Sequence, residues 1–514
     1  MGSASGKQLK AGAFLSYVSI ALNGIVGLLY MPFMLRMLGQ AEYGLYVLAT
    51  SVIAYLTVLD LGFANALVRY TACFRAEKKQ QEQYEMFGMF LLIYAVIGFI
   101  AFGLGMVLYF TAGYWFDASM GTEDLQKFRI MILLMAFNLA FTFPLGIFGG
   151  IISAYENFVF RKAVNIACIV LNPLVMVLLL SFGYRAIGMV VVTTLFNLAA
   201  LSINYWYCKK QLKIKVRFGR FRWDFFKEVG VYSFWIFLNA IMDRIYWSTG
   251  QFVLGISSGV AAVAVYAVAI QLQHIYMSFS TAISGVFLPK VTAMVTKENN
   301  EKAISDLFIR TGRIQYIIMV FVLTGFIVFG KPFILLWAGP DYEETYWIAL
   351  CFFVPLTVPL IQNLGITILQ ACNQMKFRSI LYVIIAIASL GISIPLAKQY
   401  GGIGCAIGTA SALIAGQIVA MNIYYYKKIH IDIPLFWKEI GKMSVPSVVI
   451  GASFYYLSIV YAINSISQLV VCILVFSLVY IPLFWFTGMN PYERGLFMQP
   501  VKKIITRFSN NKYD

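Results

Sequence analysis

Three charged side chains stand inside long apolar runs of this 514-residue chain: Asp60, Asp243 and Arg244. A charge at the centre of a bilayer costs at least about 2.5–3.5 kcal/mol, so such residues face a protein interior or a water-filled cavity. A carboxylate there can carry a proton or bind a cation, and a guanidinium can bind an anionic group. We therefore expect Asp60 and Asp243 to couple an ion or gate a path, and Arg244 to contact an anionic substrate.

Five further polar side chains lie within or at the ends of apolar runs: Asn65, Arg69, Gln251, Gln271 and His274. We predict that the first four bind substrate. His274 follows Gln271 by three residues, so the two share a helix face, and the imidazole is a candidate proton carrier. The alternatives are structural. Amides inside spans join helices at about 0.6 kcal/mol per hydrogen bond, and Arg69 also lies where topology alone would place a basic residue.

The elements that position these residues are membrane-spanning helices. The chain is 61% hydrophobic and 12% charged, whereas a typical soluble domain is about 25% charged. Many apolar runs reach the roughly 20 residues that cross a bilayer as a helix. The sequence thus predicts an all-α integral membrane protein. We expect fourteen spans, at residues 12–35, 43–68, 86–114, 130–155, 163–184, 186–208, 229–255, 260–289, 314–337, 345–375, 379–397, 401–426, 443–464 and 467–487.

The net charge of +17 follows the predicted topology. When alternate loops are assigned to opposite sides, 32 Lys and Arg residues fall on the side of both termini and six on the other. Basic residues concentrate on the cytoplasmic side of membrane proteins, so both termini are predicted to be cytoplasmic. Anionic membrane lipids are the natural partners of such a surface, and nucleic acid is not indicated.

The chain carries an internal duplication. Leu22-Asn23 recurs as Leu238-Asn239, a shift of 216, and Phe160-Arg161 recurs as Phe377-Arg378, a shift of 217. Each copy holds six spans, so the repeats are parallel, as in transporters whose two halves rock about a central site. The three membrane charges have no charged counterparts between the copies, which favours a site. A buried ion pair between Asp60 and Arg244 that only fixes packing is the alternative.

The duplication predicts the domain organisation. It comprises a six-helix lobe at residues 1–210, a basic cytoplasmic linker at 211–228, a second six-helix lobe at 229–428, an added helical hairpin at 429–490 and a cytoplasmic tail at 491–514. Within the linker, apolar and basic residues alternate from 212 to 218. This segment is interpreted either as a solvated connection or as an interfacial strip that gathers an anionic lipid substrate.

Several kinds of chemistry are not indicated. The seven cysteines are scattered without a CxxC pair, and the histidines number two, so neither a disulfide framework nor a metal site is predicted. Gly325 to Lys331 resembles the start of a phosphate-binding loop, but Pro332 replaces the required Ser or Thr. We therefore expect no enzyme and no cofactor, with H⁺ or Na⁺ as the possible coupling ion.

The first seventy residues carry three motifs that resemble the opening of a known family. They are Arg36-Met-Leu-Gly39, Glu42-Tyr-Gly44-Leu-Tyr46 and the run from Leu59-Asp60-Leu-Gly62 to Arg69-Tyr70. These motifs are similar to those of bacterial polysaccharide-export flippases of the O-antigen and capsule type, in the multidrug/oligosaccharidyl-lipid/polysaccharide exporter superfamily.

The resemblance implies two six-helix lobes in a V with alternating access, extended here by a C-terminal hairpin. The implied substrate is an oligosaccharide on undecaprenyl diphosphate, moved to the outer leaflet of the bacterial cytoplasmic membrane for O-antigen, lipopolysaccharide or capsule synthesis. The partners would include glycan polymerase or assembly machinery. Members of this type have cationic interiors, but here Arg244 is the single basic residue predicted deep in a span, so Arg36, Arg69, Arg129 or Arg161 would have to reach inward.

Two functional alternatives and one structural alternative stay open. Fourteen spans also resemble the lipid II flippases, although the first span, Gly12 to Leu35, lacks the basic residues typical of that family. A cation-coupled multidrug antiporter of the same superfamily would also use a membrane carboxylate such as Asp60 or Asp243. A membrane scaffold for glycan synthesis would need none of the membrane charges.

Overall fold

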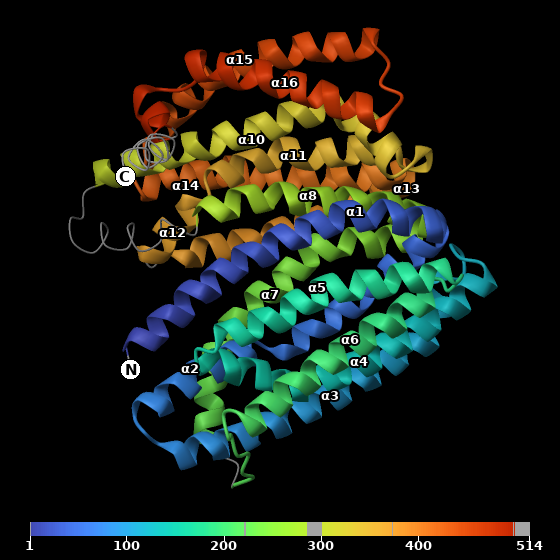
Figure 1. Cartoon of the computed structure of the whole chain (residues 1–514), viewed down its shortest axis with the longest axis vertical. Helices are drawn as coiled ribbons and strands as arrows, with labels where there is room; N and C mark the ends of the chain where they lie inside the picture. Colours follow the sequence, from blue (N-terminus) through green and yellow to red (C-terminus); the bar gives the residue numbers. More distant parts are fainter. Residues whose placement is uncertain (1, 220–222, 285–300, 373, 497, 499–514) are drawn as a thin grey trace, which may run out of the picture. The chain divides into compact units, whose positions relative to one another are not determined.

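The computed structural model describes residues 2–219, 223–284, 301–372, 374–496 and 498, and over these residues it is helical without a β-strand (Figure 1). Within the described residues, eleven helical segments are long and apolar enough to cross a membrane. Helices suit this setting because each satisfies its own backbone hydrogen bonds. The all-α membrane fold is confirmed. The count of fourteen spans and the V-shaped pair of lobes stay predictions.

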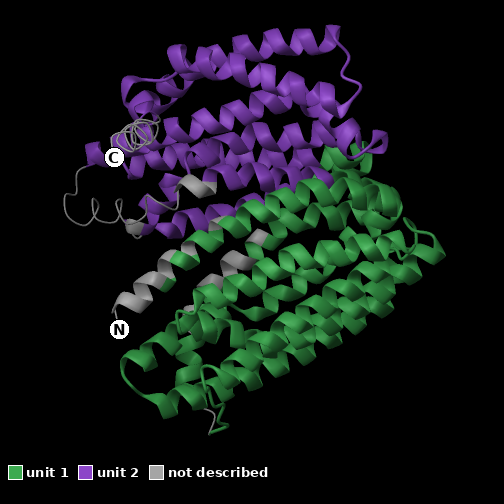
Figure 2. Cartoon of the chain, in the orientation of Figure 1, with its two compact units in different colours: residues 1–267, 390–405 green, residues 268–389, 406–514 purple. Residues whose placement is uncertain are grey.

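The chain forms two compact units (Figure 2), each described by itself: residues 1–267 with 390–405, and residues 268–389 with 406–514. The predicted lobe boundaries differ from these and stay a prediction. The helices that begin in the first unit are α1 (Gly2–Leu56), η1 (Thr57–Asp60), α2 (Phe63–Ala76), α3 (Gln80–Phe116), α4 (Thr122–Ala154), α5 (Phe158–Ser181), α6 (Ala186–Lys210), α7 (Trp223–Ser257) and α8 (Gly259–Ser284). The remaining helices are α10 (Glu301–Trp337), η2 (Pro340–Tyr342), α11 (Thr345–Ile361), α12 (Leu364–Ala371), α13 (Met375–Leu413), the π-helix η3 (Ile414–Ala420), α14 (Met421–Lys428), α15 (Ile433–Val460) and α16 (Ile466–Thr487).

Two breaks divide the long first helical stretch of the chain. Gly39 has φ 76° inside α1, where the sequence predicts the loop between the first two spans. A second break follows η1, where Leu61 and Gly62 have φ 52° and 76° before α2 begins. Left-handed backbone suits glycine and costs Leu61 energy, so the second break is a specified feature. The span that the sequence predicts over 43–68 is thus divided between the end of α1, η1 and the start of α2.

Loops that the topology assigns to one side meet in the first unit. Glu42 is 6% exposed, and one of its carboxylate oxygens lies 2.8 Å from Lys127 Nζ and 3.8 Å from Arg185 Nη1. The other oxygen accepts from the backbone N–H of Ala186 at 3.2 Å, at the start of α6. A carboxylate at a helix N-terminus is stabilised by the helix dipole. This cluster agrees with the alternation predicted for spans 1–6.

Equivalent residues of the duplication make equivalent contacts. Phe160 of α5 stacks on Tyr207 of α6 with ring centroids 3.7 Å apart, and Phe377 of α13 stacks on Tyr424 of α14 at 4.0 Å. Both members of the second pair lie 217 residues after those of the first. A shift of 216 relates Gly188 to Gly404. The π-helix η3 lies between Gly404 and Tyr424, and its wider turn adds the one residue by which the shift grows from 216 to 217.

The predicted hairpin packs on α10 in the second unit (Figure 1). It turns where the sequence indicates, since α15 ends at Val460 and Ser465 caps α16 by accepting from the N–H of Gln468. The helix α10 extends beyond the predicted span, since it begins at Glu301 rather than at residue 314, and it carries Arg313 as a buried residue, 5% exposed. The expectation that Asp60, Asp243 and Arg244 are the charges inside spans stays a prediction.

Candidate functional site

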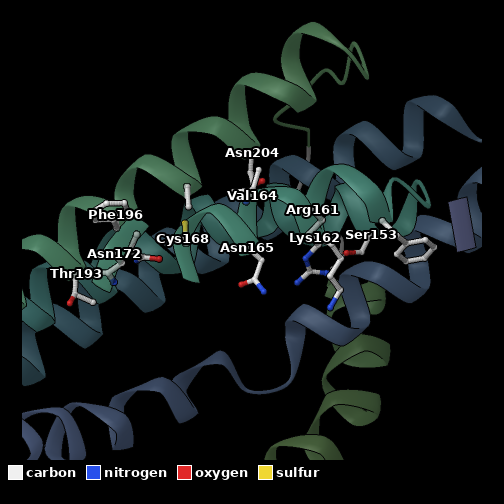
Figure 3. Close-up of a pocket in the computed structure, with 13 residues that line it drawn as sticks. Ser153, Arg161, Lys162, Val164, Asn165, Cys168, Asn172, Thr193, Phe196 and Asn204 are labelled. Carbon is white, nitrogen blue, oxygen red and sulfur yellow. The ribbon is translucent and has the colours of Figure 1, made fainter. Parts of the chain in front are cut away.

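A polar hollow of about 720 Å³ opens between α5, α6 and the end of α4 in the first unit (Figure 3). Arg161 and Lys162 lie at one end, and Asn172 and Thr193 lie at the other (Figure 3). Ligand sites typically occupy about 300–1,000 Å³. The full lining is Ser153, Phe158, Arg161, Lys162, Val164, Asn165, Cys168, Asn172, Thr193, Phe196, Asn197, Ala200 and Asn204.

The hollow is built from two matching stripes at helical spacing. On α5 the lining includes residues 161, 165, 168 and 172, and on α6 it includes residues 193, 197, 200 and 204. Both sets follow the spacing i, i+4, i+7, i+11, which places their members on one face of a helix. Eleven residues rise about 16 Å, roughly half of the hydrocarbon thickness of a bilayer. The stripes therefore carry polar groups from the predicted cytoplasmic end of α5 towards the middle of the span.

A second hollow of about 340 Å³ continues the first into the unit, because Thr193 and Asn197 line both. At the junction, Asn197 Nδ2 donates to Asn138 Oδ1 and to Thr142 Oγ1, each at 2.7 Å. The inner hollow is lined by α1, α4, α6 and Thr57 of η1. The polar path therefore reaches the 3₁₀ turn that ends at Asp60.

The electrostatic balance of the first hollow is cationic. Arg161 is exposed and donates to Ser153 Oγ, and Lys162 is half-buried beside it. No carboxylate stands among the lining residues. The amide oxygens of Asn172 and Asn204 are buried and have no hydrogen-bond partner in the described part of the chain. A buried polar group without a partner costs roughly 1–3 kcal/mol, so a hydrogen bond donated to either oxygen would recover that cost.

Asp60 lies at the break between η1 and α2, with partners inside its own unit. Tyr94 Oη donates to its Oδ1 at 2.6 Å, and the backbone N–H groups of Gly62 and Ala64 lie near enough to stabilise the charged carboxylate. The carboxylate thus ties the break before α2 to α3 through Tyr94. The described contacts of Asp60 do not include Arg244, and Arg244 forms no ion pair with a described side chain. The sequence-based pairing of these two residues is therefore not found.

The remaining predicted residues are dispersed. Arg244 is exposed and Gln251 is half-buried on α7, while Asp243 lies on the same helix with its side chain outside the described residues. Asn65 and Arg69 are exposed on α2, and the Arg69 guanidinium lies 5.6 Å from the Tyr70 ring centroid. On α8, in the second unit, Gln271 is half-buried and His274 exposed. The substrate-binding, coupling and gating roles predicted for these residues stay predictions.

Of the residues that line the hollow on α5 and α6, the sequence analysis named Arg161 alone, as a residue that could reach inward. It did not predict the asparagines of the lining, because site residues were sought by their charge and an amide is uncharged. The signal was nevertheless present: Asn165 and Asn172 share a face seven residues apart, as do Asn197 and Asn204.

Known proteins resemble this chain in sequence and in fold. Residues 9–295 match the family model described as "Polysaccharide biosynthesis protein". A Shigella flexneri protein titled "Putative O-antigen transporter" is 17% identical over 413 residues, which cover 79% of this chain and 94% of that protein. Among solved structures, the lipid II flippase MurJ in its inward closed conformation gives a TM-score of 0.70 at 16% identity, covering 95% of this chain and 99% of that chain.

An inward-facing multidrug resistance MATE transporter gives a TM-score of 0.61 at 13% identity, covering 79% of this chain and 95% of that chain. At these identities the structural likenesses show a shared fold. The family model matches more than half of the sequence. The chain therefore belongs to the polysaccharide biosynthesis protein family of membrane transporters.

Proposed function

We propose that the protein is a flippase that moves an oligosaccharide on undecaprenyl diphosphate from the cytoplasmic to the outer leaflet of the bacterial cytoplasmic membrane. The observation that carries the proposal is the hollow on α5 and α6, which has cations at one end and amides along its length. In this proposal both termini are cytoplasmic, and the glycan passes on to polymerase or assembly machinery outside.

The two ends of the hollow suit the two parts of such a substrate. The Arg161 guanidinium matches phosphate oxygens bidentately, and the Lys162 ammonium adds a second charge. Along the stripe, amides both donate and accept, as the hydroxyl groups of a sugar require. The open oxygens of Asn172 and Asn204 would each accept from a hydroxyl group.

The lining also bears on the drug-antiporter alternative. A site for a cationic drug is expected to offer carboxylates and aromatic faces. Two cations and no acid stand among these lining residues, so the hollow supports an anionic substrate. The lipid II flippase alternative shares a lipid diphosphate, and identification of the accumulated lipid separates it from the proposal.

Alternating access and ion coupling complete the proposal. Parallel repeats that rock about a central site are common among transporters, and Asp60 sits at a helix break that could change shape between states. We assign Asp60, together with Asp243 or His274, to coupling with H⁺ or Na⁺ or to gating. Arg244 and Arg69 would meet the diphosphate as it enters.

The test begins with deletion of the gene, which should trap lipid-linked glycan in the cytoplasmic leaflet and remove surface glycan. Restored expression of the variant Arg161→Ala/Lys162→Ala should leave surface glycan at a small fraction of the wild-type level. Arg378→Ala is the matched control, since Arg378 is the counterpart of Arg161 in the second copy. Normal surface glycan in the deletion strain would overturn the proposal, and a selective loss of resistance to cationic dyes would favour the antiporter.

A further inference from the structure

A further hollow lined by cations lies on the first unit, apart from the hollow on α5 and α6. We infer that the chain after α6, which folds back as a strap over residues 211–218, binds the phosphate head group of an anionic membrane phospholipid. None of the residues that line this site also lines the hollow on α5 and α6, so the inference does not depend on the proposed transport function.

The site is a hollow of about 450 Å³ between the strap and the end of α6. Three of its side chains are cations, Lys209, Lys215 and Arg217, and none of its lining residues is acidic. Glu85 lies against Gly219, which follows the strap and is not part of the lining. The lining comprises Phe148, Tyr205, Cys208, Lys209, Ile214, Lys215, Val216 and Arg217.

The strap is fixed to its own unit at both ends. The Ile214 N–H donates to the carbonyl of Cys208 at 3.0 Å, and the Arg217 N–H donates to the carbonyl of Tyr84 on α3 at 3.1 Å. The Arg217 carbonyl lies so close to Gly88 that a Cβ there would be 2.1 Å away. A glycine is therefore required for this approach, and the strap is held as part of the fold.

Buried and exposed side chains alternate along the strap, and its fixed backbone holds the exposed basic side chains on one face. Ile214 is 9% exposed and faces the unit, while the side chains of Lys215 and Arg217 are exposed on the opposite face. Extended chain places alternate residues on opposite faces. Because the backbone is already ordered, an anion that binds these cations pays little further ordering cost. A connection that only joined α6 to α7 would need neither the fixed register nor the aligned charges.

The surroundings are those of a membrane interface, which identifies a lipid as the source of the phosphate. Exposed aromatic side chains lie in the lining or next to it along the chain: Tyr205 is 41%, Trp206 50% and Phe218 70% exposed. The ammonium of Lys210 lies 5.1 Å from the Trp206 ring centroid, and that of Lys209 lies 5.9 Å from the Tyr205 centroid. Tyr and Trp concentrate at head-group level, and basic clusters beside them recognise anionic lipids.

The experiment uses the full-length protein purified in a nonionic detergent and titrated with phosphatidylglycerol, with bound lipid counted by native mass spectrometry. The strap variant is Lys209→Gln/Lys215→Gln/Arg217→Gln. The control, Lys427→Gln/Lys428→Gln/Lys438→Gln, removes the same charge from exposed positions elsewhere. We expect the strap variant to lose affinity by on the order of 100-fold, since each basic residue contributes roughly fivefold, and the control to lose less than about twofold.

Competition identifies the source of the phosphate. Inorganic phosphate at millimolar concentration should not displace phosphatidylglycerol, and undecaprenyl diphosphate should compete no better than phosphatidylglycerol itself. An equal loss in both triple variants, displacement by inorganic phosphate, or a tenfold preference for undecaprenyl diphosphate would each overturn the inference. If the triple variant does not fold, the single changes decide, each with a loss of roughly fivefold.

Discussion

The two copies of the repeat differ at one corresponding junction between helices, which is open in the first copy and packed in the second. In the first copy, Cys168 and Asn172 line an open polar hollow. Their counterparts in the second copy, 217 residues later, are Ile385 and Ser389. A Cβ on Gly416 would lie 2.1 Å from the Ile385 side chain, so isoleucine fills that space, and Ser389 Oγ donates to Thr409 Oγ1 at 3.4 Å. A duplicated scaffold therefore holds an open hollow in one copy and a packed core in the other.

The contrast extends to charges. Arg161 in the first unit is exposed, whereas Arg313 in the second is 5% exposed and fully engaged. Arg313 Nε donates to Glu493 Oε1 at 2.6 Å, and its Nη1 donates to Glu439 Oε2 at 2.7 Å. These contacts join α10 to both ends of the hairpin. A buried charge with all its partners fixes structure, while an open one remains available to a ligand.

The largest expected effect comes from breaking the closed cluster with Arg313→Met. Two carboxylates would lose their buried partner, and removal of one member of a buried ion pair costs about 3–5 kcal/mol. We expect a marked fall in the thermal unfolding temperature of the purified protein. Arg161→Met, at the open position, should change stability by no more than about 0.5 kcal/mol.

A compensated variant sharpens this result. Replacing the whole cluster, as Arg313→Met/Glu439→Gln/Glu493→Met, leaves no unpaired buried charge and should recover most of the lost stability. If the single variant is as stable as the wild type, the cluster does not hold the hairpin and the contrast between the copies fails.

The second prediction concerns a variant that replaces residues of the open junction in the first copy with those of the packed junction in the second. Asn172→Ser/Asn204→Met introduces the residues that stand at these positions in the second copy, Ser389 and Met421. Two acceptors for sugar hydroxyls are lost, so transport, followed as surface glycan at limiting expression, should fall on the order of tenfold. Stability should be unchanged or slightly raised, because both lost oxygens were buried without a partner in the described part of the chain. Unaltered transport would show that the hollow is not part of the path.

The third prediction concerns Asp60, which belongs to a break without an equivalent in the second copy. The corresponding stretch, Tyr276 to Ser280, lies within the continuous helix α8. Asp60→Ala removes the acceptor of the Tyr94 hydroxyl and should cost about 1 kcal/mol of stability. Asp60→Asn keeps an acceptor for Tyr94 and should remain nearly as stable, yet it cannot carry a charge. Transport in the asparagine variant decides the coupling role: wild-type rates would leave Asp60 with a structural role alone.

Much of the fold could be predicted from sequence because hydrophobic length and duplication are strong signals. The matched stacks of Phe160 on Tyr207 and Phe377 on Tyr424 bear out the register of the repeat. Helix ends were less predictable. The hydropathy of the sequence falls at the first charge, so the predicted span excluded Arg313. The helix itself continues to Glu301, and Arg313 pairs with the half-buried Glu439 and the buried Glu493 from distant segments.

The candidate site was predictable only in part, for a related reason. A search for charge finds Asp60 but not its break, because the left-handed turn at Leu61 and Gly62 depends on contacts with Tyr94 and α2. It also passes over amides such as Asn172, whose importance lies in the missing partner rather than in the residue type. The comparison of copies identifies such positions from sequence once the register is known.

The smallest expected effect tests the part that the copies share. Phe160→Leu and Phe377→Leu each remove one aromatic stack, and such a pair contributes about 0.5–1.5 kcal/mol beyond the area it buries. Both substitutions should lower the unfolding temperature by a similar amount and leave transport per folded molecule unchanged. A transport defect confined to Phe160→Leu would place this stack in the site, since Phe160 precedes Arg161 directly. Equal and purely structural losses would mean that residues conserved between the copies build the scaffold, and that the positions where the copies differ carry the transport function.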